Sequence, residues 1–331
     1  MLIKIQKDAF ETSNSKAIKL LIDEICYHLR YELFIDLESI EQFEKLDLYN
    51  TLDADYQEII KRSFIRVIQQ SLEADFVIAK NPSENTFTVN EAMLFLQQPV
   101  SIILEHSEND AHFLNALIKH FKKKSKKIQQ HKDNNWLQYV FGGGSTIEAC
   151  VTTILKRYEN LPKASHHYIR CFVLRDSDKE HPSMQLKTET ENLIIFLQKH
   201  KIPYHILEKR EMENYMPDIV FETIENKENR DFIQAYLRLS PIQKDFFDIE
   251  KGFPDKNWSS FPREIQDLYK SVGEKDITVF RKKKVERHFK TDFPKWFLDD
   301  TVKQANLLER THHQTNPTEL QDILAKITKL L

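Results

Sequence analysis

The sequence Val100-Ser101-Ile102-Ile103-Leu104-Glu105 is a short apolar run that ends on a carboxylate. Runs of this kind are typical of strands that are buried on both faces of a parallel sheet. Three further apolar runs occupy 136–141, 170–174 and 204–207, and helical patterns separate them, beginning near Asn109 and covering 146–156 and 186–200. Strands that alternate with helices predict an α/β fold with a mostly parallel sheet flanked by helices.

The sequence on either side of this alternation has a different pattern. Before residue 98, apolar residues recur at helical spacing, for example Leu21, Ile25 and Leu29, and a Pro-containing break lies at 81–88. Beyond Asp218 the chain becomes helical and charged. We therefore expect three regions: an N-terminal helical region over 1–98, a core over 99–220, and a helical, basic extension over 221–331.

Composition excludes several classes of protein. With 40% hydrophobic residues in 331, the chain can bury a core, so it is neither disordered nor collagen-like. No apolar run approaches the roughly 18–20 residues of a membrane span, and the first ten residues do not resemble a secretory signal. Cys26, Cys150 and Cys171 are isolated, which argues against a disulfide framework. We expect a soluble, cytoplasmic protein without membrane contact.

Charge is distributed unevenly. Residues 1–98 hold 10 Lys and Arg against 17 Asp and Glu, whereas Ala111–Lys132 contains seven lysines and no acid. Lys122, Lys123 and Lys124 lie at the centre of this run and are candidates for binding nucleic-acid phosphates. A solvated helix end is the equally weighted alternative.

Glycine is scarce, and three of the five glycines are consecutive: Gly142, Gly143 and Gly144. Because glycine is disfavoured inside helices and strands, this cluster indicates a sharp turn or a close approach of the backbone to another group. The loop is a candidate for contacting phosphate. It lacks the spacing of a P-loop, so we expect no ATP site in this chain.

Acidic residues follow two of the expected strands. Glu105 ends the first, and Asp176 and Asp178 follow the third. Ligands of open α/β sheets bind at the carboxyl ends of the strands, and residues two apart in an extended segment point to the same side. Carboxylate oxygens suit Mg²⁺ or Mn²⁺, so we expect a site for one or two such ions. Taken alone, Asp176 and Asp178 would also fit a polar turn without a metal. The presence of Glu105 at the end of a strand in a preceding βα unit favours the metal site instead.

The order strand–Glu, strand–Gly, strand–Asp-x-Asp resembles the Toprim domain, a Rossmann-like catalytic fold shared by topoisomerases, primases and the OLD (overcoming lysogenisation defect) nucleases. The stretch Arg210-Glu211-Met212-Glu213-Asn214-Tyr215 resembles the segment after the fourth strand in OLD-type Toprim proteins. The likeness covers about 100–218 and does not extend to residues 1–98.

This resemblance implies further site residues. Asp110 and Glu213 would complete the acids at the metal, and Lys283 would be the catalytic lysine, with Lys282 and Lys284 as alternatives. In the Toprim pattern the glutamate lies four residues before the aspartate, whereas Glu105 lies five residues before Asp110. Either one extra residue lengthens the turn after the first strand, or Glu108 is the ligand instead. We favour Glu105 because it directly follows the strand. Arg175 and Lys209 are candidates for contacting phosphate.

The resemblance also implies an activity and partners. We expect a metal-dependent endonuclease that cuts DNA or RNA, acting as the toxic effector of a bacterial anti-phage system. OLD-type proteins carry an ABC-type ATPase that this chain lacks, so a separate ABC-type or SMC-like ATPase is the expected protein partner. Residues 1–98 would bind that ATPase, form a homodimer, or cover the site. The alternative is a catalytically silent Toprim-like module that docks to a partner protein.

Overall fold

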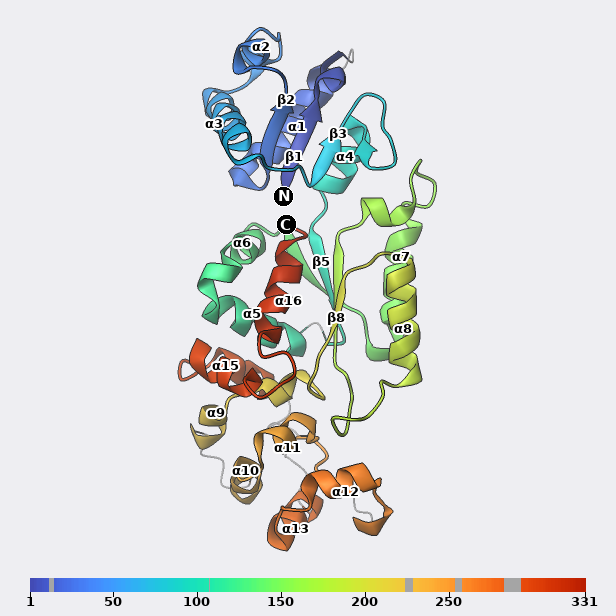
Figure 1. Ribbon diagram of the computed structural model, residues 1–331, viewed down its shortest axis with the longest axis vertical. Helices are drawn as coiled ribbons and strands as arrows, with labels where there is room; N and C mark the ends of the chain where they lie inside the picture. Colours follow the sequence, from blue (N-terminus) through green and yellow to red (C-terminus); the bar gives the residue numbers. More distant parts are fainter. Residues whose placement is uncertain (12–14, 107, 224–228, 254–257, 283–292) are drawn as a thin grey trace.

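The structure, a computed structural model, describes the chain apart from residues 12–14, 107, 224–228, 254–257 and 283–292. The described chain contains two four-stranded sheets, and all strand pairs in both are parallel. In Figure 1 the first sheet lies at one end of an elongated molecule, the second lies in the middle, and helices from later in the chain lie at the other end. The expected α/β class, with parallel sheets flanked by helices, is confirmed.

The second sheet matches the four predicted strands. These are β5 (Val100–Leu104), β6 (Leu137–Phe141), β7 (Cys171–Arg175) and β8 (Tyr204–Ile206), in the order β6-β5-β7-β8. All residues of β5 and β7 are buried, because these two strands form the centre of the sheet. Ile103 pairs with Val173, so the carboxyl ends of β5 and β7 lie side by side at one edge.

Helices cover both faces of this sheet (Figure 1). One face carries α5 (Asn109–His120), α6 (Lys122–Asp133) and α16 (Glu319–Thr328), and the other carries α7 (Ile147–Lys156) and α8 (Thr188–Lys199). Because side chains alternate along a strand, Ile102 packs with the first group and Ile103 with the second.

The prediction that residues 1–98 are only helical is wrong. This region contains the first sheet, with strands β1 (Leu2–Gln6), β2 (Glu32–Asp36), β3 (Phe76–Ile78) and β4 (Thr86–Phe87) in the order β2-β1-β3-β4. The predicted helical patterns do form helices, α1 (Ser15–Cys26) and α3 (Ala54–Gln70). β3 and β4 span three and two residues, which is too short for a periodic signal, and β1 carries lysine among its apolar residues.

The remaining described elements are short helices and 3-10 turns. In the first region they are η1 (Lys7–Glu11), η2 (Tyr27–Leu29), α2 (Ile40–Glu44), η3 (Tyr49–Thr51) and α4 (Val89–Leu96). Around the second sheet they are η4 (Gly144–Thr146), η5 (Ser165–Tyr168) and η6 (Met212–Tyr215). After η6 come α9 (Asp218–Thr223), α10 (Arg230–Leu237), α11 (Pro241–Phe246), η7 (Trp258–Ser260), α12 (Arg263–Tyr269), α13 (Glu274–Lys282), η8 (Phe293–Leu298) and α15 (Gln304–Thr311).

Buried polar contacts join the two sheet regions. The Arg170 guanidinium, just before β7, donates to the Tyr31 hydroxyl of the first region and to the carbonyl of Leu330 at the end of the chain. The Glu91 carboxylate of α4 accepts from Lys163 at 3.0 Å and from the Tyr168 hydroxyl. None of the helices that the structure describes combines the length and apolar character needed to span a membrane.

Candidate metal centre

Glu105 is held at the end of β5 by a cation and a glycine. Its carboxylate lies 3.4 Å from Nε of Arg175, and only 16% of its side chain is exposed. A Cβ atom on Gly144 would lie 3.1 Å from Oε1 of Glu105, so the glycine leaves room for this carboxylate. Burial raises the pKa of Glu105, the Arg175 charge opposes that rise, and the Asp178 charge adds to it.

Asp110 turns back toward Glu105 from the first turn of α5. Its Oδ2 atom accepts the backbone N–H of His106 at 2.9 Å, and its own N–H donates to the His106 carbonyl at 2.9 Å. These two bonds tie Asp110 to the residue that follows Glu105. Burial raises the pKa of Asp110 to about 7, and the charge of Glu105 contributes to the rise. Glu108 is exposed, and its charge acts on His112.

Asp176 lies at the end of β7, within the field of the other acids. Its Oδ1 atom accepts the N–H of Met212 at 3.0 Å, which ties it to η6. Burial raises the pKa of Asp176 well above its usual range, and the charges of Glu213, Asp110 and Glu105 add to the effect in that order. The structure therefore brings together four predicted acids, from two strand ends, one helix and η6.

Glu211 belongs to the segment 210–215, but it was not among the predicted residues of the site. Burial raises the pKa of Glu211 to about 7, and the charge of Glu213 is the next largest cause. Its position two residues before Glu213 is the sequence feature that could have predicted a place in the site. The segment is fixed by Asn214, whose amide donates to the carbonyls of Lys244 and Phe247 at 2.7 and 2.9 Å.

Asp178 lies differently from the prediction. The prediction assumed an extended segment, but Asp178 has φ +55°, in the left-handed region, and its N–H donates to the Arg210 carbonyl at 2.9 Å. The chain turns after Asp176, so the alternation of side chains along an extended strand no longer applies to Asp176 and Asp178. The Asp178 carboxylate instead pairs with Lys187 at 3.3 Å, although its charge still acts on Glu105.

The glycine loop makes the sharp turn and close approach that its composition predicts. Gly143 has φ +61°, and a Cβ on Gly142 would lie 2.7 Å from Cγ1 of Ile147. The carbonyl of Gly144 accepts from Nη1 of Arg175 at 3.2 Å, which links the loop to Glu105 through one guanidinium. Arg175 is buried among these groups. Contact of the loop or of Arg175 with phosphate stays a prediction.

The predicted role of Lys209 in binding phosphate does not fit its position. Only 1% of this residue is exposed, and its ammonium group pairs with Asp245 and donates to the Arg310 carbonyl at 2.6 Å. Burial lowers the pKa of Lys209 to about 7. Residues distant in sequence enclose this lysine, so it holds the C-terminal helices rather than a ligand.

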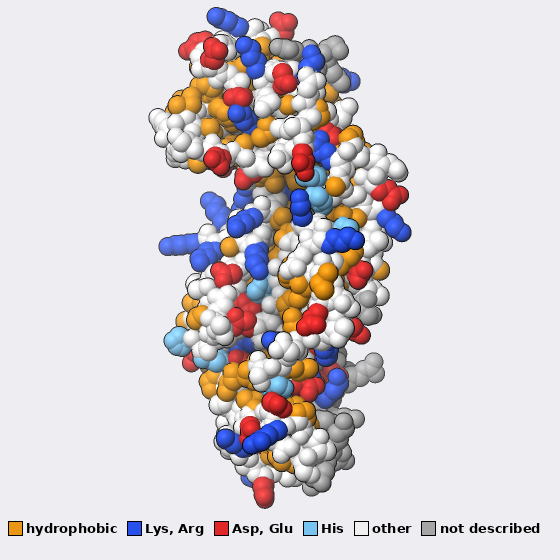
Figure 2. All heavy atoms as spheres, turned by 45° about the vertical axis from the view of Figure 1, so that its right-hand side comes forward, with side chains coloured by type: hydrophobic (Ala, Val, Ile, Leu, Met, Phe, Trp, Pro, Cys, Tyr) orange, Lys and Arg blue, Asp and Glu red, His pale blue; other side chains and the backbone are white. Residues whose placement is uncertain are grey.

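The lysine run lies apart from the carboxylates. Lys122, Lys123 and Lys124 are exposed on α6, and none of them is among the main charges that act on Glu105, Asp110 or Asp176. In Figure 1, α6 lies beside the chain termini, and Figure 2 shows Lys and Arg side chains gathered there. Lys283 and Lys284 lie outside the described residues, which end α13 at Lys282.

The donor set fits a hard divalent ion. Glu105, Asp110, Asp176 and Glu213 offer only carboxylate oxygens, which Mg²⁺ and Mn²⁺ prefer. Within the described part of the chain, no three His, Cys, Asp or Glu side chains are already placed to hold an ion together. Mg²⁺ commonly keeps several waters and takes one or two carboxylates directly, so such a preformed group is not required.

Comparisons with known proteins assign no relative. No family model matches the chain, and neither the curated proteins nor the solved structures contain a match.

Proposed function

We propose that this chain is a divalent-metal-dependent nuclease that hydrolyses phosphodiester bonds in nucleic acid. One observation carries the proposal: Glu105 and Asp176, from the carboxyl ends of two adjacent parallel strands, lie within one electrostatic cluster with Asp110 and Glu213. Ligands of open α/β sheets bind at this edge. Buried carboxylates that repel one another favour a bound cation, because it relieves the repulsion.

Each residue has a distinct part in the proposed reaction. Glu105, Asp176 and Glu213 would hold one or two Mg²⁺ or Mn²⁺ ions, and Asp110 would support Glu105 from α5. Bound ions would polarise the phosphate and lower the pKa of an attacking water. Arg175 orients the Glu105 carboxylate and brings a positive charge to the site, which would help to stabilise the negative charge of the transition state.

The sequence motifs also support a proposal about the family and the biological role of the protein. The order of Glu105, the glycine loop and Asp176, together with the segment 210–215, supports a Toprim-type nuclease related to OLD proteins. On the same resemblance we propose an anti-phage effector that is controlled by a separate ABC-type or SMC-like ATPase. Two other arrangements are consistent with that region: a homodimer through residues 1–98, or coverage of the site by these residues.

A second candidate is a Toprim-like module that binds a partner without catalysis. The ion pair between Asp178 and Lys187 favours it, because a predicted ligand is already engaged by a cation. Absence of phosphodiesterase activity in the folded wild type would leave docking as the role of this edge.

A cleavage assay tests the proposal. Wild type is incubated with supercoiled plasmid and with total tRNA, in Mg²⁺ or Mn²⁺, and compared with Glu105→Gln, Asp176→Asn and the matched control Glu108→Gln. We expect metal-dependent cutting of one substrate by wild type and the control, and a rate at least about 100-fold lower in the other two variants. Equal cutting by all four proteins would contradict the assigned site. Absence of cutting by the folded wild type, with the ATPase partner also supplied, would favour the docking module.

A further inference from the structure

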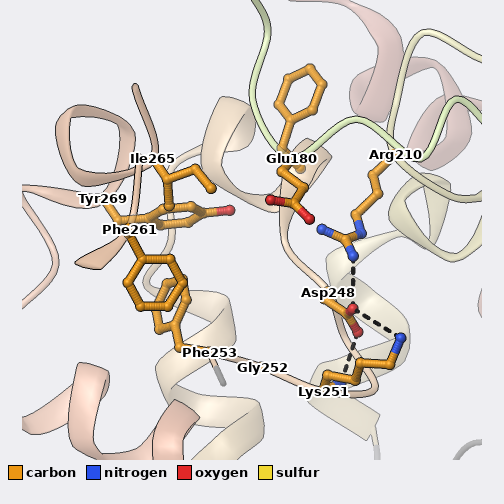
Figure 3. A pocket seen from close by; sticks show the side chains of 10 residues that line it. Glu180, Arg210, Asp248, Lys251, Gly252, Phe253, Phe261, Ile265 and Tyr269 are labelled. Atoms are coloured by element: carbon orange, nitrogen blue, oxygen red, sulfur yellow. Dashed lines mark hydrogen bonds and ion pairs between the residues drawn. The ribbon is translucent and has the colours of Figure 1, made fainter. Parts of the chain in front are cut away.

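A pocket lies between segments that follow strands β7 and β8 and the helices that come after them in the chain. Its volume is about 200 Å³. Figure 3 shows its side chains in close view. The lining includes Arg210, Asp248, Lys251, Phe253, Phe261 and Tyr269.

The pocket has one apolar wall and one charged wall (Figure 3). The apolar wall contains aromatic rings: the centroid of Phe253 lies 4.9 Å from that of Tyr269 and 6.1 Å from that of Phe261, both edge to face. On the charged wall, Arg210 donates to Asp248 at 2.8 Å. A flat ligand with polar edges would be matched by such a pair of walls.

Arg210 connects this pocket to the candidate metal centre. Its Nε atom donates to Glu211 at 3.2 Å, and its carbonyl accepts the N–H of Asp178 at 2.9 Å. Two residues further on, the N–H of Met212 donates to Asp176. Arg210 therefore both lines the pocket and contacts Glu211, an acid whose charge acts on Asp176.

We propose that the pocket binds one unpaired nucleobase of the strand whose phosphate lies at the carboxylates, which makes single-stranded nucleic acid the substrate class. This inference rests on the proposed nuclease function. A cavity of about 150 Å³ holds benzene, so 200 Å³ accommodates one planar heterocycle. Stacking on aromatic rings is independent of sequence because every base has a π-face.

Lys251 lies at the mouth of the pocket and supplies a second contact of a different kind. Its side chain is 72% exposed, and its Nζ atom lies 4.0 Å from Asp248. In Figure 3 it extends past Asp248 on the charged wall. We expect it to contact the phosphate beside the bound base, a contact that does not depend on whether the base is present.

The test measures binding rather than cleavage. Two fluorescent single strands of equal length, one with bases and one fully abasic, are titrated by anisotropy in EDTA. Wild type should bind the strand with bases at least about tenfold more tightly, the range expected for base stacking. Phe261→Ala should bind both strands equally, Phe261→Trp should keep the preference, and Lys251→Ala should weaken both strands by the same factor. Tyr27→Ala, an exposed aromatic of the first region, is the matched control.

The outcomes separate this inference from the proposed function. Equal binding of the two strands by wild type would overturn the base pocket while leaving the cleavage result untouched. Failure of wild type to bind either strand would also overturn the base pocket, whereas the nuclease proposal is decided separately by the cleavage assay, which supplies the metal. Because Phe261 is only partly buried, Phe261→Ala should melt close to wild type; if it does not, Phe261→Leu, which keeps the bulk without the aromatic face, replaces it.

Discussion

At the scale of single residues, the candidate site is a set of buried and half-buried acids in which Arg175 lies beside Glu105. Glu105 has Arg175 beside it, whereas the main charges acting on Asp176 are those of other acids. A chain that folds only to pack a core gains nothing from such repulsion. Repulsion between these acids lowers the stability of the metal-free fold, and a bound cation would relieve it. Removing one of the charges should therefore raise the stability of the metal-free protein.

Asp110→Asn should stabilise the metal-free protein, and more so as pH rises. The native pKa of Asp110 is raised to about 7 from an unfolded value near 3.8, so between these values the native state binds more protons and wild-type stability falls as pH increases. Asparagine still accepts the His106 N–H but carries no charge. We expect a gain of about 2 kcal/mol at pH 8, shrinking toward pH 4, measured by thermal melts in EDTA. A gain that does not change with pH would contradict this account.

Residue types predicted some positions of the site and missed others. Glu105 and Asp176 were predictable because each directly follows a strand with a strong apolar signal. The direction of Asp178 was predicted wrongly because its left-handed backbone conformation arises from the turn that it belongs to. The spacing of Asp176 and Asp178 in the sequence does not show this conformation. Lys209 was misjudged because Asp245 and Arg310, which enclose it, come from distant parts of the chain.

At the scale of elements, the turn η6 fixes the second half of the site. Asn214 is fully buried, and its side chain also accepts the N–H of Glu211 at 2.9 Å, in addition to donating to the carbonyls of Lys244 and Phe247. Tyr215 donates its hydroxyl to Glu319 of α16. These bonds explain why an asparagine and a tyrosine follow the acids in this segment.

Asn214→Ala should destabilise the fold and loosen the site together. Three hydrogen bonds are lost and two buried carbonyls lose a donor, so we expect a loss of about 2–4 kcal/mol in the free energy of unfolding. Urea titration measures it, with the exposed Asn90→Ala as the control that should stay within about 0.5 kcal/mol of wild type. A loss no larger than that of the control would show that η6 does not depend on these bonds.

Elements of the second sheet were predictable, and those of the first sheet were not, for a physical reason. Strands buried on both faces need continuous apolar runs, which β5 and β7 have. β3 and β4 are too short to carry any pattern, and the pairing of β3 with β1 and of β4 with β3 is decided by tertiary packing. The pocket of Figure 3 was also hidden, because its walls come from segments between Glu180 and Tyr269 that only the fold brings together.

At the scale of the whole molecule, the two sheets are linked by buried polar contacts. Arg170 reaches from the start of β7 to Tyr31 and to Leu330, and so connects the first region, the second sheet and the end of the chain. Tyr168 belongs to the core of the first region although it precedes β7. We therefore expect the described regions to unfold as one cooperative unit.

Arg170→Ala should lower the stability of both regions. It removes two buried hydrogen bonds and leaves a cavity, for which we expect a loss of about 3 kcal/mol in a single transition. Hydrogen exchange should report reduced protection in β1 and in β5 alike, and the exposed Arg157→Ala is the control. Two separate transitions, with only one of them shifted, would mean that the sheets fold independently.

The central claim, that the acids at the carboxyl edge of the second sheet form a divalent-metal site, is tested most directly by a Mn²⁺ titration followed by electron paramagnetic resonance. We expect wild type and Glu108→Gln to bind one or two Mn²⁺ ions per chain. We expect Asp176→Asn to bind Mn²⁺ with an affinity at least about tenfold weaker. Binding by Asp176→Asn that equals wild type, in a folded protein, would contradict the claim.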